Sequence, residues 1–158
     1  MRELVRSTLD LSGTGTAGLS LLQQTEDGGE VFRWEALSGV MEHAVGGAIP
    51  RDWSPCGTTV DRRTPQLFSR PSRCFEYFND VTPAIVEGLV VPIYVERVPL
   101  GTLWIASHDE HRKFSADDLE VLSRLANFYS AAVRIMRLRQ NKEAMQQPEP
   151  ASSVANSK

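Results

Sequence analysis

The residue best placed for chemistry is Cys56, which follows a strong helix-start signal. Ser54 is a favoured N-cap residue and Pro55 is favoured at the first helical position, so a helix is predicted to begin here. Cys56 would then lie where backbone N–H groups and the helix dipole stabilise a thiolate. Such a thiolate would serve as a redox sensor or a catalytic nucleophile. The alternative, which we favour, is a packed and inert cysteine, because no activating base is visible in the sequence.

The three histidines are the other candidate acid–base or metal-binding groups. His108 and His111 flank two acidic residues, but no third ligand lies nearby at metal-binding spacing, and a solvated polar loop is the simpler interpretation. His43 lies in a long irregular segment, residues 38–53, and such loops in compact domains are usually functional or mobile. We therefore expect no metal site and keep His43 as a candidate ligand-binding residue.

Aromatic residues gather in the segment that follows this loop. Small-molecule sites combine aromatic side chains with a few polar groups, and an ordinary minor core uses the same residues, so both interpretations stay open. Trp34 and Trp104 lie in predicted strands and are expected in the core. The candidate ligand-binding residues are His43, Trp53, Cys56, Phe68, Phe75, Tyr77 and Phe78.

Residues 13–18 read Gly-Thr-Gly-Thr-Ala-Gly, a literal G-x-G-x-x-G pattern. A dinucleotide site needs a strand before this pattern and a helix after it, because the helix N-terminus holds the pyrophosphate. The predicted order here is helix and then strand. The pattern therefore predicts a flexible turn and not a Rossmann fold.

Composition places the chain among ordinary globular domains. Its 158 residues are 41% hydrophobic and 23% charged, enough for one core without disulfides or a structural metal. A net charge of -3 argues against binding to nucleic acid or to anionic membranes. No apolar run approaches the roughly 20 residues that span a bilayer, and the N-terminus lacks a signal-peptide pattern. We expect a cytoplasmic, single-domain protein.

Hydrophobic patterning predicts the elements that position these residues. A helix over residues 2–11 comes first, with Leu4, Thr8 and Leu11 on one face. Two hairpins follow, and Pro92 should place its strand at an edge, a bulge or a bend. The hairpin strands are predicted at 17–24 with 31–37, and at 87–95 with 101–108.

The remaining elements lie between and after the hairpins. A short helix is predicted to end near residue 63, followed by a strand at 65–69 and a turn or short helix at 71–78. The last helix begins at Ser115, and its apolar stripe continues at least to Met136. A stripe this long indicates a partner, most simply a second copy, although the helix's own sheet is the alternative. Residues 139–158 are predicted to be a helix extension and a disordered tail.

This order of elements is typical of an α+β domain with an antiparallel sheet. A set of stretches has a distinctive order and spacing: residues 17–19, Gly39, 50–57, 91–93, 100–105 and 114–118 leading into 122–126. Taken together, these stretches resemble a GAF domain of the bacterial sensor-kinase type. The resemblance implies a PAS-related sheet of five or six strands, with the terminal helices on one face and a loop-covered pocket on the other.

The resemblance also implies a function. Residues 1–138 would form a sensory domain for an unidentified small molecule. The domain would pair as a homodimer through its terminal helices and signal to a histidine kinase, as in two-component systems, or to another output protein. We expect no catalytic activity in the chain itself. Phytochrome-type GAF domains attach a bilin through a Cys-His pair, but neither Cys56 nor Cys74 precedes a histidine, so no bilin is expected and the cofactor is unknown.

Two alternative functions remain open. Residues 56–58, Cys-Gly-Thr, are similar to the cysteine element of the free methionine-(R)-sulfoxide reductases, which are GAF-like enzymes. Their resolving cysteines lie close before the Val-Val-Pro strand, whereas Cys74 lies well upstream of residues 90–92 and has no partner. The second alternative is a ligand-free dimerisation module with a collapsed pocket.

Overall fold

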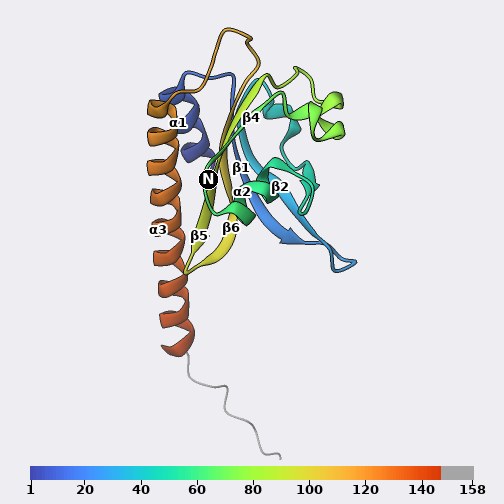
Figure 1. The fold of residues 1–158 in the computed structure, drawn as a ribbon. Helices are drawn as coiled ribbons and strands as arrows, with labels where there is room; N and C mark the ends of the chain where they lie inside the picture. Colours follow the sequence, from blue (N-terminus) through green and yellow to red (C-terminus); the bar gives the residue numbers. More distant parts are fainter. Residues whose placement is uncertain (147–158) are drawn as a thin grey trace, which may run out of the picture.

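A curled antiparallel sheet is the centre of the computed structural model, which describes residues 1–146. Its six strands lie in the order β3-β2-β1-β6-β5-β4, so the α+β prediction is confirmed (Figure 1). The strands are β1 (Thr16–Gln24), β2 (Glu30–Gly39), β3 (Ala48–Pro50), β4 (Gln66–Ser69), β5 (Glu87–Val95) and β6 (Val98–Ser107). The helices are α1 (Arg2–Ser12), α2 (Pro55–Arg62) and α3 (Ala116–Gln146), with 3-10 turns η1 (Glu42–Ala44), η2 (Pro71–Arg73) and η3 (Glu76–Asp80).

The two predicted hairpins form the middle of the sheet. In the second, Glu96 and Arg97 have φ angles of 53° and 71°, the left-handed conformation of a two-residue turn that matches the twist of the strands. Because the turn is this tight, β6 begins at Val98, three residues before its predicted start at Gly101. β5 pairs with β4 only through residues 87–90, so Pro92 lies beyond this pairing, at an edge as predicted.

Each face of the sheet has its own hydrophobic core. Because side chains alternate along a strand, Leu19, Leu103 and Ile105 point to α1 and α3, where they meet Leu122. The opposite face carries a second core under α2 and the 3-10 turns, and its buried side chains include Phe32, Trp34, Met41, Ile49 and Trp104. The sheet therefore separates the terminal helices from the loop segments (Figure 1).

Two sequence predictions about this framework were wrong, at least in part. Thr8 is buried and Leu4 packs against the core, as predicted for one face of α1, but Leu11 is 64% exposed and Val5 takes part in the buried face instead. The Thr8 hydroxyl donates to the Leu4 carbonyl and so tolerates burial. The irregular segment over residues 38–53 contains the edge strand β3, in which Ile49 pairs with Phe32. Three residues are too few to show an alternating pattern, so only the neighbouring strand reveals this element.

The start of α3 is held by a carboxylate. The Asp118 carboxylate accepts from the Ser115 N–H at 2.8 Å, and Ser115 Oγ lies 3.4 Å from the Asp118 N–H, the reciprocal arrangement of a capping box. Arg112 donates two hydrogen bonds to the same carboxylate and a third to the carbonyl of Ser12 at the end of α1. This cluster joins the two terminal helices.

α3 continues well past the sheet, through Gln146 (Figure 1). The predicted tail beyond that residue lies outside the described part of the chain. Across residues 1–146, no helix combines the length and the apolar character that a membrane crossing requires.

Candidate functional site

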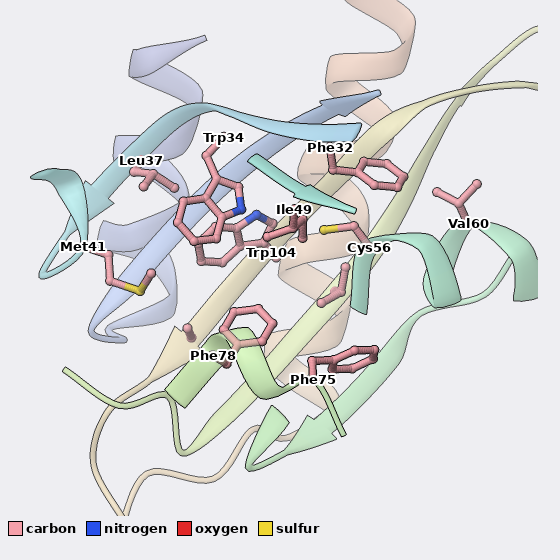
Figure 2. Packing of buried hydrophobic residues seen from close by; sticks show 12 residues of the cluster. Phe32, Trp34, Leu37, Met41, Ile49, Cys56, Val60, Phe75, Phe78 and Trp104 are labelled. Carbon is pink, nitrogen blue, oxygen red and sulfur yellow. The ribbon is translucent and has the colours of Figure 1, made fainter. Parts of the chain in front are cut away.

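A small cavity lies between the sheet and the segments that cover its loop face. Its volume is about 40 Å³, within a recess of about 420 Å³ that includes open solvent. Trp34 of β2, Trp104 of β6 and Phe68 of β4 line it on the sheet side. Cys56 of α2 and Phe78 of η3 line it from the covering segments. In Figure 2 the Cys56 sulfur points from α2 toward Ile49 and Trp104.

The sheet side of the cavity exists because two neighbouring residues are small. Gly88 of β5 pairs with Ala106 of β6 on one side and with Phe68 of β4 on the other. A Cβ atom built on Gly88 would have no heavy atom within 4 Å, so this position opens directly onto unfilled space. Larger side chains at this pair would occupy the cavity.

The two tryptophans of the lining pack against each other. Their ring centroids are 6.2 Å apart, and the Trp104 indole N–H donates to Ser20 Oγ at 2.8 Å. Gly18 lies beside Trp104 in the sheet, where a Cβ atom would come within 2.2 Å of the indole ring. Sequence patterning assigned both tryptophans to the core, and it missed that they also border the cavity.

Cys56 lies in the first turn of α2, as predicted, but its environment opposes ionisation. Ser54 caps the helix by accepting from the Gly57 N–H at 3.0 Å. The thiol is 3% exposed, and the Thr102 hydroxyl donates to its sulfur at 3.2 Å. Burial raises the pKa of Cys56 to about 11. Desolvation therefore outweighs the hydrogen bonds that favour the thiolate. This environment agrees with the favoured interpretation of a packed, inert cysteine and not with a stabilised thiolate.

Thiol labelling should separate the two cysteines. At about pH 8, about one Cys56 thiol in a thousand would be ionised, whereas Cys74 is exposed. We expect iodoacetamide to modify one thiol of the native protein, none of a Cys74→Ser variant, and both thiols after unfolding, as read by mass spectrometry. Rapid modification of folded Cys74→Ser protein would contradict this account of Cys56.

The other candidate ligand-binding residues divide into two groups. Phe75 is buried in the same core, and Tyr77 packs between Phe75 and Trp53 and donates its hydroxyl to the Trp53 carbonyl at 3.0 Å. Trp53 is 49% exposed and His43 is exposed in η1, and neither lines the cavity. The fold thus brings Cys56, Phe68 and Phe78 to the cavity, places Phe75 and Tyr77 behind them, and leaves His43 apart. Their binding role stays a prediction.

His108 has a structural position that the solvated-loop interpretation did not anticipate. Its Nδ1 lies 3.0 Å from the Ala84 carbonyl and its Nε2 lies 2.8 Å from the Thr16 hydroxyl, so the ring joins the segment before β5 to β1. His111 is exposed, as expected for a loop. Among residues 1–146 no three His, Cys, Asp or Glu side chains are grouped closely enough to hold a metal ion.

A second unusual surface lies on the opposite side of the molecule, along α1 and α3. Here a groove of about 540 Å³ is lined mainly by apolar side chains, including Leu4, Leu125 and Tyr129. Phe128 and Met136 also line it and are 68% and 58% exposed. These side chains form a contiguous apolar set, which is less common on protein surfaces than scattered apolar residues.

The arrangement is similar to several solved structures. The second GAF domain of DevS from Mycobacterium smegmatis is 17% identical, with a TM-score of 0.71 over 89% of this chain and 95% of that one. The PixJ GAF domain of Thermosynechococcus elongatus, in its blue-light absorbing form, is 17% identical, with a TM-score of 0.75 over 92% and 89%. The GAF domain of an Acinetobacter phosphoenolpyruvate-protein phosphotransferase is 18% identical, with a TM-score of 0.69 over 85% and 80%.

Sequence comparison gives the family. No curated protein matched the chain. A family model described as the GAF domain matches residues 1–134, which include all six strands and the first part of α3. The chain belongs to the GAF domain family.

Proposed function

We propose that this chain is a sensory module that binds a small molecule on the loop face of its sheet and transmits the change through α1 and α3. GAF-family membership supports this role, and the cavity lies in the pocket that the sequence resemblance implied. Cys56, Phe68 and Phe78, with Trp34 and Trp104, would contact the ligand.

The observation that carries the proposal is a direct connection between the cavity helix and α3. The Tyr94 hydroxyl of β5 donates to the Val60 carbonyl in α2, the helix that also carries Cys56. The Tyr94 carbonyl accepts from the Ser130 hydroxyl in α3. Movement of α2 on ligand binding would therefore act on α3 through a single residue, which is the physical link that a two-state sensor needs.

We propose that the exposed apolar surface on α1 and α3 passes the conformational change to a partner. A second copy of the chain would cover Phe128 and Met136 and form a homodimer, and the output would be a histidine kinase or another signalling protein. The continuation of α3 beyond the sheet supports this arrangement, because its apolar side chains Ile135, Met136 and Leu138 are more than half exposed. We propose no catalytic role, since the protonated Cys56 thiol weighs against a cysteine-dependent sulfoxide reductase.

One preparation tests both halves of the proposal. Purified protein would be incubated with a metabolite mixture, separated from unbound compounds and denatured, and the released molecules identified by mass spectrometry. Sedimentation would give the oligomeric state. We expect a retained compound and a dimer, and we expect a Phe128→Glu variant to be monomeric while it retains the same compound, because Phe128 lies on the face opposite the cavity.

A matched control is Glu120→Gln, an exposed substitution on α3 away from the groove lining, which should leave the dimer intact. Protein that retains no compound above the level of an unrelated protein would overturn the sensory proposal. Sedimentation of the wild type as a monomer would overturn the proposed homodimer.

A further inference from the structure

The projecting end of α3 carries an apolar stripe of its own (Figure 1). Its members are spaced by four, three and seven residues and therefore share one face of the helix: Ala131, Ile135, Leu138 and Met145, called here the distal stripe. Ala131 is exposed, Ile135 and Leu138 are 52% and 56% exposed, and Met145 is 88% exposed. This spacing is the a and d pattern of a coiled coil, in which each apolar side chain enters a hole on a facing helix.

The distal stripe lies on a different face of α3 from the groove that Phe128 and Met136 line. Leu138 follows Met136 by two residues, which is about 200° of rotation around the helix, so the two side chains point in nearly opposite directions. The stripe borders a second groove, of about 490 Å³, which α3 forms with Val95 and Glu96 at the turn between β5 and β6. A partner seated on the first groove would therefore leave the distal stripe exposed.

The side chains that flank the distal stripe are basic. Arg134 and Arg139 occupy the positions called g and e in a coiled coil, one on each side of the apolar seam. Lys142 lies within the stripe, between Leu138 and Met145. Residues 134–146 contain four basic side chains and one acidic side chain, although the whole chain has a net charge of -3. The projecting end of α3 is therefore a basic segment of an acidic protein.

These charges disfavour a second copy of the chain as the occupant of the stripe. In a parallel pair of helices, position g of one faces the next position e of the other, so Arg134 of one copy would meet Arg139 of the other. In an antiparallel pair, each arginine would meet its own counterpart. A facing helix with glutamate or aspartate beside its apolar seam would instead form an ion pair at each contact, and such charges set partner choice.

A lipid surface fits the stripe less well than a helix does. An interfacial helix inserts a broad apolar face into the headgroup region of the bilayer. The distal stripe is narrow, because Arg134 and Arg139 lie on its two sides and Lys142 lies within it. Its width corresponds to the contact with one facing helix.

We propose that the projecting end of α3 binds an acidic amphipathic helix of another protein. The distal stripe would bury its apolar side chains against that helix, and Arg134 and Arg139 would pair with its carboxylates. This inference rests on the proposed function, since it names the chemistry of the output partner that receives the change from α3.

An NMR titration of the isotope-labelled full-length protein tests the inference with two synthetic peptides. Both peptides are roughly four heptads long, with isoleucine at a and leucine at d, and they carry either glutamate or lysine at all e and g positions. Repulsion between the glutamates keeps the acidic peptide from pairing with itself. We expect the acidic peptide to give saturable shifts centred on residues 131–146, with an affinity that falls as salt is added. The lysine peptide should give no shifts.

Three variants locate the contact. Leu138→Glu should weaken binding of the acidic peptide at least about tenfold, because it places a charge in the apolar seam. Arg139→Glu should weaken it about fivefold, because an attraction becomes a repulsion. The matched control is Arg137→Glu, which makes the same charge change at an exposed position away from the seam and should alter the affinity by less than about twofold. All three positions are exposed, so unchanged resonances from the sheet should show that the fold is kept.

The inference is overturned if the acidic peptide gives no saturable shifts, if both peptides give equal shifts, or if Arg137→Glu weakens binding as much as Arg139→Glu. Vesicles of phosphatidylcholine and phosphatidylserine serve as a third probe. Tighter binding to these vesicles than to the acidic peptide would assign the stripe to a membrane and would also overturn it. The outcome is separable from that of the proposed function. A monomeric wild type that responds to the acidic peptide refutes the homodimer alone, whereas a dimer that retains a compound but ignores the peptide refutes the acidic partner alone.

Discussion

Replacing Gly39 with alanine is expected to lower the free energy of unfolding by about 3 kcal/mol. Gly39 ends β2 with a φ of 94°, a conformation that L-residues rarely adopt. A Cβ atom there would lie 2.2 Å from the Gly15 carbonyl oxygen, which accepts the N–H of Val40 at 2.9 Å. The substitution therefore combines backbone strain with a clash that displaces a hydrogen bond between the start of β1 and the end of β2.

Urea denaturation of the Gly39→Ala variant measures this loss, and Gly88→Ala is the matched control. A Cβ atom added at Gly88 would meet open space, and alanine reduces the conformational entropy of the unfolded chain, so stability should stay equal or rise by about 0.4–1 kcal/mol. Equal destabilisation by both substitutions would contradict the special role assigned here to the conformation and close contacts of Gly39.

Replacing Asp118 with asparagine is also expected to have a large effect. It should lower the free energy of unfolding by about 2 kcal/mol near neutral pH. Asp118 is 9% exposed, and its carboxylate accepts hydrogen bonds from Arg112 and from the Ser115 N–H at the start of α3. Arg112 in turn donates to the Ser12 carbonyl at the end of α1. An asparagine keeps the size of the side chain but removes the charge that pairs with the guanidinium and one of its acceptor oxygens.

The pH dependence of stability should distinguish Asp118→Asn from the wild type. Burial alone would raise the pKa of Asp118, but hydrogen bonds from Arg112 and Ser115 outweigh it and hold the pKa below its usual value of 3.8. A carboxyl with a depressed folded-state pKa stabilises the protein fully above its unfolded pKa, and this contribution disappears as the pH falls through the folded value. Wild-type stability should therefore fall more steeply in acid than that of Asp118→Asn.

The control for this experiment is Asp117→Asn, since Asp117 is exposed in the same helical turn. Its substitution should change stability by less than about 0.5 kcal/mol and leave the acid dependence as in the wild type. Parallel acid profiles for Asp118→Asn and the wild type would show that the carboxylate does not carry the predicted linkage.

Local signals predicted the regular elements well. The Ser54–Pro55 start of α2 and the Ser115 start of α3 are both present, because capping depends on neighbouring backbone groups that the sequence itself specifies. The errors arose where a distant segment decides the outcome. β3 exists because residues 48–50 pair with β2, and the buried face of α1 follows the position of the sheet and of α3.

The candidate site was predicted only in part. Cys56, Phe68 and Phe78 do meet at one cavity, whereas His43 and Trp53 lie outside it. The sequence did not predict that Gly88 and Ala106 border the cavity, because a small residue in a strand indicates a cavity only when its neighbours across the sheet are known. The thiol of Cys56 was placed correctly at a helix start, but its ionisation depends on burial beneath residues far away in the chain.

The sequence by itself determined the helices and all strands except β3, because periodicity, turns and caps are local. Its resemblance to GAF domains implied the family and the sheet architecture, because the spacing of the matching stretches is distinctive. Only the tertiary structure decided the size and chemistry of the cavity, the protonation of Cys56 and the connection from α2 through Tyr94 to α3. These properties depend on which side chains meet across the sheet and how far water is excluded from them, and both follow from contacts between residues distant in sequence.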